Sequence, residues 1–382
     1  MRFLKNGIWS CLMILLISAT ITVALADDQQ CPVLNHGHKW RIGFCESEPY
    51  LDYASSLYYV IQGMKESGWI SGIEDLPFRV GQDDTLEMWK WLSTHHVGDY
   101  IQFVGDAHYD LKEINDPKGA HIIRRLKQEK DLDLMIVTGT SAGLALSKGD
   151  HTVPTLIFST SDPIGAGLIK SANDSGKDNI WVHVDQGQFR RQIQVFHDGF
   201  HFKRLGLVYE HSDLVRNYIA LGDIETMARE RNFSIVDRNV KEPVNQEDQP
   251  RYYRQLKAAY QEIAPRVDAM LLTVSPVNPE KLPQLLTPFS QFKVPVFSQS
   301  GAGEVRYGAL MSITQNDFPN LKMFAAGTLT QVLHGRKPRS LPQVFESTPR
   351  IILNVEVAKL IGYQPTFDIL LVADEIYRRI GN

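Results

Sequence analysis

The stretch "DLMIVTGTSAGLAL" (Asp133–Leu146) decides the fold class predicted for this chain. Its first half, Leu134–Val137, is a continuous apolar run with the length of a buried strand. Gly139 interrupts the run, and the small and apolar residues that follow fit a helix that starts at once. A strand that passes directly into a helix is the repeating unit of a parallel α/β sheet.

The same strand-then-helix unit recurs on both sides of this stretch. Upstream, Trp40–Ser47 is a short apolar strand, and Tyr50–Trp69 repeats its apolar residues with helical period. Downstream, Val153–Ser161 is another apolar strand. The other strands are predicted over Leu76–Gly81, Asp99–Asp106, Arg204–Glu210, Phe233–Arg238, Val267–Pro276, Val294–Ser300 and Tyr307–Ile313. Repeated units of this kind predict parallel, doubly wound sheets.

The repeat is interrupted by residues 162–203, which are rich in Gly, Pro, Asn and Asp. We therefore predict an α/β fold of two doubly wound, Rossmann-like lobes with a ligand cleft and a hinge between them. We expect residues 39–163 with about 316–340 to form the N-terminal lobe. Residues 164–315 with about 341–382 would then form the C-terminal lobe.

The composition is that of an ordinary globular protein, with 43% hydrophobic and 22% charged residues among 382. This composition excludes a disordered, collagen-like or coiled-coil chain. Lys and Arg number 40 against 44 Asp and Glu, which gives a formal net charge of -4. Because such a chain has no overall positive field, nucleic acid is not a predicted partner.

Residues 1–26 have the pattern of an export signal. Arg2 and Lys5 precede an uncharged, mainly apolar run, and Ala24 and Ala26 fit cleavage after Ala26. The alternative is an uncleaved anchor, since the apolar run is almost long enough to span a bilayer. No later stretch is long and apolar enough to do so. We therefore expect a periplasmic protein with no stable membrane insertion after cleavage.

Two cysteines, Cys31 and Cys45, follow the predicted signal peptide. In an oxidising compartment we expect a disulfide between them, closing a loop of about 15 residues worth roughly 3 kcal/mol. The alternative is two free thiols. No metal site or cofactor is predicted, because no group of His, Cys and acidic residues has a recognised ligand spacing.

Polar residues follow the predicted strands where open α/β sheets bind their ligands. Thr140 and Ser141 begin a helix, whose free backbone N–H groups carry partial positive charge and could hold a carboxylate. Ser161 and Asp162 follow the next strand. The alternative is that such residues are ordinary helix caps and turns. Because six such loops would ring one cleft, we interpret them together as a ligand site.

At this point the sequence resembles a known family. "DLMIVTGTSAGLAL" and "VPTLIFSTSDPIGAGL" (Val153–Leu168) are similar to a pair of motifs in ABC transporter substrate-binding proteins of the tryptophan/tyrosine-binding type. Those proteins have the type I periplasmic binding fold, and the likeness extends from about Lys39 to the C-terminus. The resemblance implies ligand contacts at Glu48, Thr140, Ser141, Ser161, Asp162, Glu210, Ser212, Ser275 and Ser298.

The function predicted from these observations is solute binding without covalent chemistry. The protein would capture a small polar molecule, with amino acids and other carboxylates as candidates, and close over it. Its partner would be an ABC permease with its ATPase, or a sensor kinase if the protein serves signalling. The sequence does not separate these two roles.

The enzyme alternative is a serine hydrolase. "GTSAG" (Gly139–Gly143) is a literal G-x-S-x-G between a strand and a helix, which would make Ser141 the nucleophile. Asp198, in an Asp-Gly pair, and the late His334 are its candidate partners. However, no Gly-rich oxyanion loop follows the first strand, and His334 stands before Gly335 as at a helix C-terminus. We therefore favour a binding protein over an enzyme.

Overall fold

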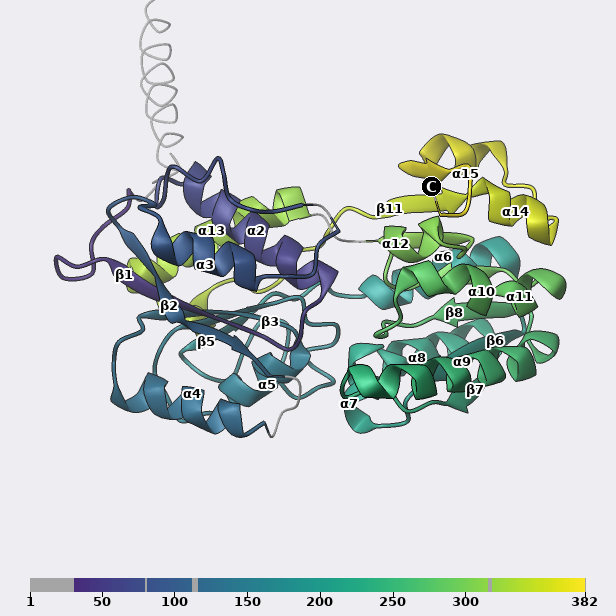
Figure 1. Ribbon diagram of the computed structural model, residues 1–382, viewed down its shortest axis with the longest axis horizontal. Helices are drawn as coiled ribbons and strands as arrows, with labels where there is room; N and C mark the ends of the chain where they lie inside the picture. Colours follow the sequence, from purple (N-terminus) through teal and green to yellow (C-terminus); the bar gives the residue numbers. More distant parts are fainter. Residues whose placement is uncertain (1–30, 80, 112–115, 315–317, 382) are drawn as a thin grey trace, which may run out of the picture.

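The computed structural model describes residues 31–79, 81–111, 116–314 and 318–381, which form two α/β lobes side by side (Figure 1). The predicted signal peptide lies outside the described residues. Within those residues, no helix combines the length and hydropathy needed to cross a bilayer. The predicted fold class, two doubly wound lobes, is confirmed.

The first lobe has a five-stranded parallel sheet in the order β2-β1-β3-β4-β5. Its strands are β1 (Trp40–Glu46), β2 (Ile101–Asp110), β3 (Leu134–Thr138), β4 (Thr155–Phe158) and β5 (Ile180–Val182). Its helices are α2 (Leu51–Glu66), α3 (Leu86–Thr94), α4 (Pro117–Gln128), α5 (Thr140–Ser147) and, from much later in the chain, α13 (Phe318–Leu333). β3 and β4 are buried along their whole length, which explains their unbroken apolar sequences.

The second lobe has a seven-stranded sheet in the order β12-β11-β10-β9-β8-β6-β7. Its strands are β6 (Arg204–Tyr209), β7 (Ser234–Asn239), β8 (Ala269–Leu272), β9 (Val296–Ser298), β10 (Met311–Thr314), β11 (Arg350–Asn354) and β12 (Glu375–Tyr377). Its helices are α6 (Gln188–Phe200), α7 (Asp213–Tyr218), α8 (Leu221–Arg231), α9 (Gln249–Ile263), α10 (Leu282–Leu285), α11 (Thr287–Gln291), α12 (Ala302–Arg306), α14 (Val355–Ile361) and α15 (Phe367–Val372). The strands from β6 to β10 are parallel, whereas β11 runs antiparallel to β10.

Two predictions about the first lobe were wrong. Residues 76–79 form no strand, and Phe78 stacks on Tyr58 of α2 with ring centroids 4.0 Å apart. The predicted lobe boundary after residue 163 also comes too early. Ile180–Val182 pair with β4, so the chain leaves the first sheet only after Val182.

The chain passes between the lobes in three places: from β5 to α6, from β10 to α13, and from α13 to β11. The first and third connections lie together, because Val184 and Val344 form a parallel bridge. Asp185 reinforces this contact by accepting hydrogen bonds from the Arg191 guanidinium at 2.7 Å and the Ser347 amide at 3.1 Å. These paired segments are the structural candidate for the predicted hinge.

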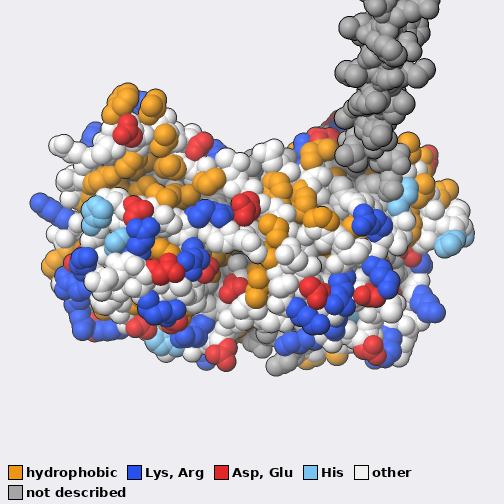
Figure 2. All heavy atoms as spheres, turned by 180° about the vertical axis from the view of Figure 1, so that it is seen from behind, with side chains coloured by type: hydrophobic (Ala, Val, Ile, Leu, Met, Phe, Trp, Pro, Cys, Tyr) orange, Lys and Arg blue, Asp and Glu red, His pale blue; other side chains and the backbone are white. Residues whose placement is uncertain are grey.

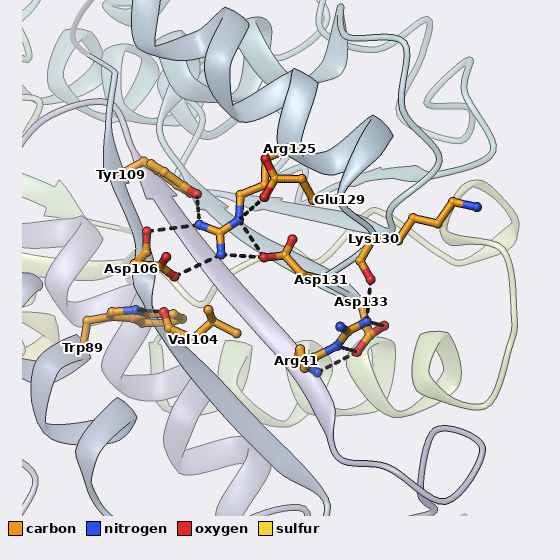
Figure 3. A network of polar contacts seen from close by, with 10 residues as sticks. All are labelled: Arg41, Trp89, Val104, Asp106, Tyr109, Arg125, Glu129, Lys130, Asp131 and Asp133. Atoms are coloured by element: carbon orange, nitrogen blue, oxygen red, sulfur yellow. Dashed lines mark hydrogen bonds and ion pairs between the residues drawn. The ribbon is translucent and has the colours of Figure 1, made fainter.

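A network of charged side chains joins β2, α4 and the loop before β3 in the first lobe (Figure 3). The Arg125 guanidinium is buried and donates to carboxylate oxygens of Asp106 at 3.0 Å and Asp131 at 2.7 Å. It also donates to the Tyr109 hydroxyl at 2.8 Å. Because every polar contact of this arginine is internal to the first lobe, we assign the network a structural role.

The predicted disulfide is wrong: Cys31 is an exposed free thiol and Cys45 a buried one. The segment after Cys31 is held at the start of β1, where the Trp40 indole donates to the Val33 carbonyl at 2.8 Å. Cys45 stands near the other end of β1, about 17 Å further along the strand. A disulfide needs Cα atoms within about 7 Å of each other, so these two thiols cannot meet.

Candidate ligand-binding site

The two sheets share the positions at which doubly wound folds bind ligands. In each lobe the strand order reverses between the first and third strands, at β1/β3 and at β6/β8. The loops that leave the carboxyl ends of these strands carry most of the predicted site residues. Figure 1 shows the lobes facing each other along these loops.

The start of α5 is a buried part of the site. Thr140 and Ser141 are both buried, and their hydroxyls make no hydrogen bond within the described residues. The Ala142 amide, by contrast, donates to Ser47 Oγ at 3.1 Å. Gly139 has φ +90, and a Cβ there would lie 2.4 Å from both Ser47 Oγ and the Tyr53 hydroxyl. Only glycine fits this turn, which leaves the first amides of α5 directed to the edge of the sheet.

Ser161 and Asp162 follow β4 in the same lobe. Both are partly buried, and the Asp162 carboxylate accepts a hydrogen bond from the Gly165 amide at 2.8 Å, which fixes the turn. Asp162 also faces the second lobe. The pKa of Asp223 on α8 is raised, mainly by burial and further by the negative charge of Asp162.

In the second lobe, three side chains form an acidic cluster. The Tyr218 hydroxyl at the end of α7 donates to Glu242 Oε2 at 2.5 Å. Glu210, which follows β6, accepts from the Glu242 amide at 2.8 Å. Burial raises the pKa of Glu242 to about 7, with further contributions from the negative charges of Glu210 and Glu48. The site therefore holds a carboxyl group that is poised between its two charge states at neutral pH.

Two features join the lobes across this site. The charge of Glu48, an exposed residue after β1, contributes to the raised pKa values of both Tyr218 and Glu242 in the other lobe. Tyr50, two residues later, makes a side-chain hydrogen bond with Ser300, which follows β9. The predicted residues Glu48 and Glu210 are thus brought together with Glu242, although they come from different lobes.

Three predicted residues are engaged inside the second lobe instead. Ser212 caps α7 by accepting from the Val215 amide at 3.3 Å. Ser275 makes a hydrogen bond with Tyr252 beside a cavity of about 10 Å³, room for about one water. Ser298 is fully buried and donates to Glu304 Oε2 at 2.7 Å. Ser212 is thus a helix cap, which was the alternative interpretation of such residues. Ser298 holds the loop after β9 in place.

Sequence reasoning missed Tyr50, Tyr218, Glu242 and Ser300. Tyr50 lies in the loop after β1, but the sequence analysis placed it in the apolar periodic stretch Tyr50–Trp69. Glu242 lies three residues beyond β7, an edge strand of its sheet, and no site residue was predicted after that strand. A search of the residues after every parallel strand would have included it.

The proposed hydrolase partners do not meet Ser141 within the described residues. Asp198 lies on α6, where it pairs with Arg231 at 2.5 Å. The His334 ring, at the end of α13, contacts the Cys31 carbonyl at 3.1 Å. Across the parts of the chain that the structure describes, no group of three His, Cys, Asp or Glu side chains could hold a metal ion.

Two facing, doubly wound lobes with paired connections and polar strand ends define a two-lobed binding protein of the type I periplasmic fold. The chain belongs to the ABC transporter substrate binding protein family, whose model matches residues 106–377. The predicted family is thereby confirmed.

Individual relatives are distant in sequence. A tyrosine-binding protein of Clostridioides difficile is 21% identical over 235 residues, which are 61% of this chain and 64% of the relative. The match thus spans a little less than two thirds of that protein's length. A conserved domain protein from Vibrio cholerae and an ABC domain from Streptococcus pneumonia in complex with L-Trp each have TM-score 0.64 and 18% identity. Each alignment covers 88% of this chain and 99% of the other, and it shows a shared fold.

Proposed function

We propose that this protein is an exported, non-enzymatic binding protein that captures an amino acid between its lobes and delivers it to an ABC transporter. One observation carries the proposal. Polar groups of both lobes lie at the strand ends: Thr140 and Ser141 at the start of α5 in the first lobe, and Glu210, which accepts from the Glu242 amide at 2.8 Å, in the second. Such an arrangement suits a ligand that contacts both lobes.

The two halves of the site suit the two charges of an amino acid. In the first lobe, the hydroxyls of Thr140 and Ser141 and the start of α5 are donors for a carboxylate. In the second lobe, Glu242 and Glu210 are acceptors for an ammonium group. Tyr53 and Tyr218 add aromatic surface near these groups. Relatives that bind tyrosine or hold L-Trp make aromatic amino acids the first ligands to test.

The same charges explain how a ligand would favour closure. Glu48 and Glu242 approach each other from opposite lobes, and two negative charges in a partly buried site repel. An ammonium group placed between them replaces repulsion with attraction. The ligand therefore binds the closed form better than the open form, which is the condition for a ligand-driven change.

The test is a thermal-shift screen of the chain from Asp27 with the twenty amino acids, beginning with L-Trp and L-Tyr. A ligand at a hundredfold excess over its Kd stabilises by about 2.7 kcal/mol, which gives a shift of several degrees. E242Q should lose most of this shift, whereas E247Q, an exposed change in the same lobe, should keep it. The absence of a shift with every amino acid would contradict the proposed ligand class.

Export and the lack of enzymatic chemistry are tested separately. N-terminal sequencing of protein recovered from the periplasm should begin at Asp27. A fluorophosphonate probe should leave Ser141 unlabelled in the folded protein. Labelling that disappears in S141A would instead support the hydrolase reading of the Gly139–Gly143 motif.

A further inference from the structure

Two of the three connections between the lobes run side by side, at residues 183–187 and 342–347. The Val184 amide donates to the Gln343 carbonyl at 2.9 Å, and the Phe345 amide donates to the Val184 carbonyl at 3.1 Å. The outline of the molecule is indented between the lobes (Figure 2). The orientation of one lobe relative to the other therefore depends on how these paired connections bend.

One end of the pair is held by the first lobe. The His183 amide donates to the Ile157 carbonyl of β4 at 2.9 Å, which continues the first sheet by one residue. In the other connection, the Phe345 ring stacks on Phe324 of α13 with ring centroids 5.3 Å apart. Both connections are thus attached to the first lobe as far as residues 183 and 345.

The other end is held by the second lobe through the Asp185 carboxylate, whose side chain is 5% exposed. Its Oδ1 accepts from the Arg191 guanidinium of α6 at 2.7 Å, and its Oδ2 accepts from the Ser347 amide, shortly before β11, at 3.1 Å. α6 is in turn fixed to the second sheet, since the buried Gln192 side chain donates to the Ile313 carbonyl of β10 at 2.6 Å. One carboxylate thus joins both connections to the second lobe, directly beyond their contacts with the first.

We propose that Asp185 is a positioning residue of the hinge, which makes the two connections bend together about a single axis. The pivot then lies between Val184 and Asp185 in one connection and between Phe345 and Ser347 in the other. A carboxylate can do this because each of its oxygens accepts a hydrogen bond from a different element. Without it, the connections bend independently, and the lobes twist as well as close. The inference rests on the proposed function only in that closure captures the ligand.

A positioning role differs from a structural role in what the loss of Asp185 changes. The Arg191 side chain is 35% exposed, so water screens its attraction to the carboxylate and the pair contributes little to stability. Loss of the carboxylate should therefore change the range of lobe orientations while the melting temperature stays nearly the same.

Double electron–electron resonance measures the range of lobe orientations without any ligand. Spin labels are attached at Q128C on α4 and A258C on α9, two exposed positions in different lobes, in the C31S background of the chain from Asp27. The wild-type hinge should give one narrow distance distribution. D185N keeps the shape of the side chain but replaces one acceptor oxygen with a donor, and it should broaden the distribution about twofold.

Two further variants grade and control the effect. R191M should broaden the distribution less than D185N, because the Ser347 amide can still donate to Asp185. D198N is the matched control: Asp198 also pairs with an arginine of the second lobe, but it lies near the other end of α6. It should leave the width unchanged.

Hydrogen exchange in the wild type tests the contact without any variant. The Ser347 amide should exchange slowly, because it donates to the buried Asp185 carboxylate. Fast exchange throughout residues 346–348, or equal distribution widths for the wild type and D185N, would overturn the proposal. A thermal-shift screen with no binding amino acid would contradict the proposed function alone, since neither hinge measurement contains a ligand.

Discussion

The two lobes share one sheet order but have different polar groups at their strand ends. The strands β2-β1-β3-β4-β5 of the first lobe correspond in order to β7-β6-β8-β9-β10 of the second. At the carboxyl ends of these strands, the first lobe has the hydroxyl groups of Thr140 and Ser141, which follow β3. The second lobe has the carboxyl groups of Glu210 and Glu242, which follow β6 and β7, the counterparts of β1 and β2. In the proposed function, the topology fixes where the ligand binds, and the side chains at these strand ends decide which charge each lobe would recognise.

The lobes also differ in how they are completed. The first lobe needs a helix from far along the chain, since α13 packs on α2 and contributes Ala325, Leu329 and Val332 to the core. The second lobe is extended at its edge by β11 and β12. The first lobe therefore depends on a long-range contact, whereas the second carries an added surface. The predictions below test these differences, from the largest effect to the smallest.

W69A should destabilise the first lobe by about 3–5 kcal/mol, the usual cost of truncating a buried tryptophan. Trp69 is fully buried, and its indole donates to Thr330 Oγ1 of α13 at 2.8 Å. Urea unfolding followed by far-UV circular dichroism measures the change. W91A, at a partly exposed tryptophan, is the control and should cost clearly less. Equal costs would show that the α13 contact does not support the lobe.

E242Q should weaken ligand binding by about 10- to 100-fold, the effect of losing one charged hydrogen bond. The substitution keeps the shape of the side chain while removing the charge that lies beside Glu210 and Glu48. Isothermal titration with the ligand found in the thermal-shift screen measures it. An affinity within twofold of the wild type would place the ammonium group elsewhere and remove the proposed division between the lobes.

The buried Glu46 should make the first lobe less stable as pH rises. Burial raises its pKa to about 8 in the folded state, from 4.5, so the protonated form stabilises the fold. That contribution is complete below about pH 4.5 and is lost as pH rises through 8. Between pH 6 and pH 8 the wild type should lose about 2.3 kcal/mol relative to E46Q.

Urea midpoints at several pH values measure this difference. The neighbouring His108 does not obscure it, because burial lowers the pKa of that ring to about 4 and its cost falls below pH 6.5. The Thr85 hydroxyl, which donates to Glu46 Oε1 at 2.7 Å, can donate equally to a glutamine. Parallel pH profiles for the two proteins would show that Glu46 is already ionised at pH 6.

Y50F should have the smallest effect, about 0.5–1.5 kcal/mol, since it removes one neutral hydrogen bond to Ser300. Because that bond joins the lobes, its loss should favour the open form. Small-angle scattering without ligand should show a slightly larger radius of gyration. S56A, which removes a hydroxyl contact within the first lobe, is the control and should leave the radius unchanged.

The sequence predicted what local patterns encode. Apolar runs located β1, β3 and β4, and the residues directly after them, Thr140 and Asp162, lie where parallel strands end. The prediction from sequence failed where the position of a residue is set by contacts with residues far away in the chain. Phe78 lies in a short apolar run but packs on a helix, and the two cysteines are separated by the length of a strand.

The missed part of the site has the same origin. Tyr218 and Glu242 are 24 residues apart, and neither shows its partner in the local sequence. The contact between Tyr50 and Ser300 joins loops of different lobes. Such pairs become visible only when the two sheets are placed side by side.

The return of α13 to the first lobe has a consequence for biosynthesis. As the chain emerges from the ribosome, α2 and the first five strands are made long before the helix that covers them. The apolar face of α2 stays without its cover until residue 333 has been synthesised. Folding that begins at the N-terminus therefore cannot complete the first lobe before α13 has been made. The nascent first half does not form a complete compact lobe by itself.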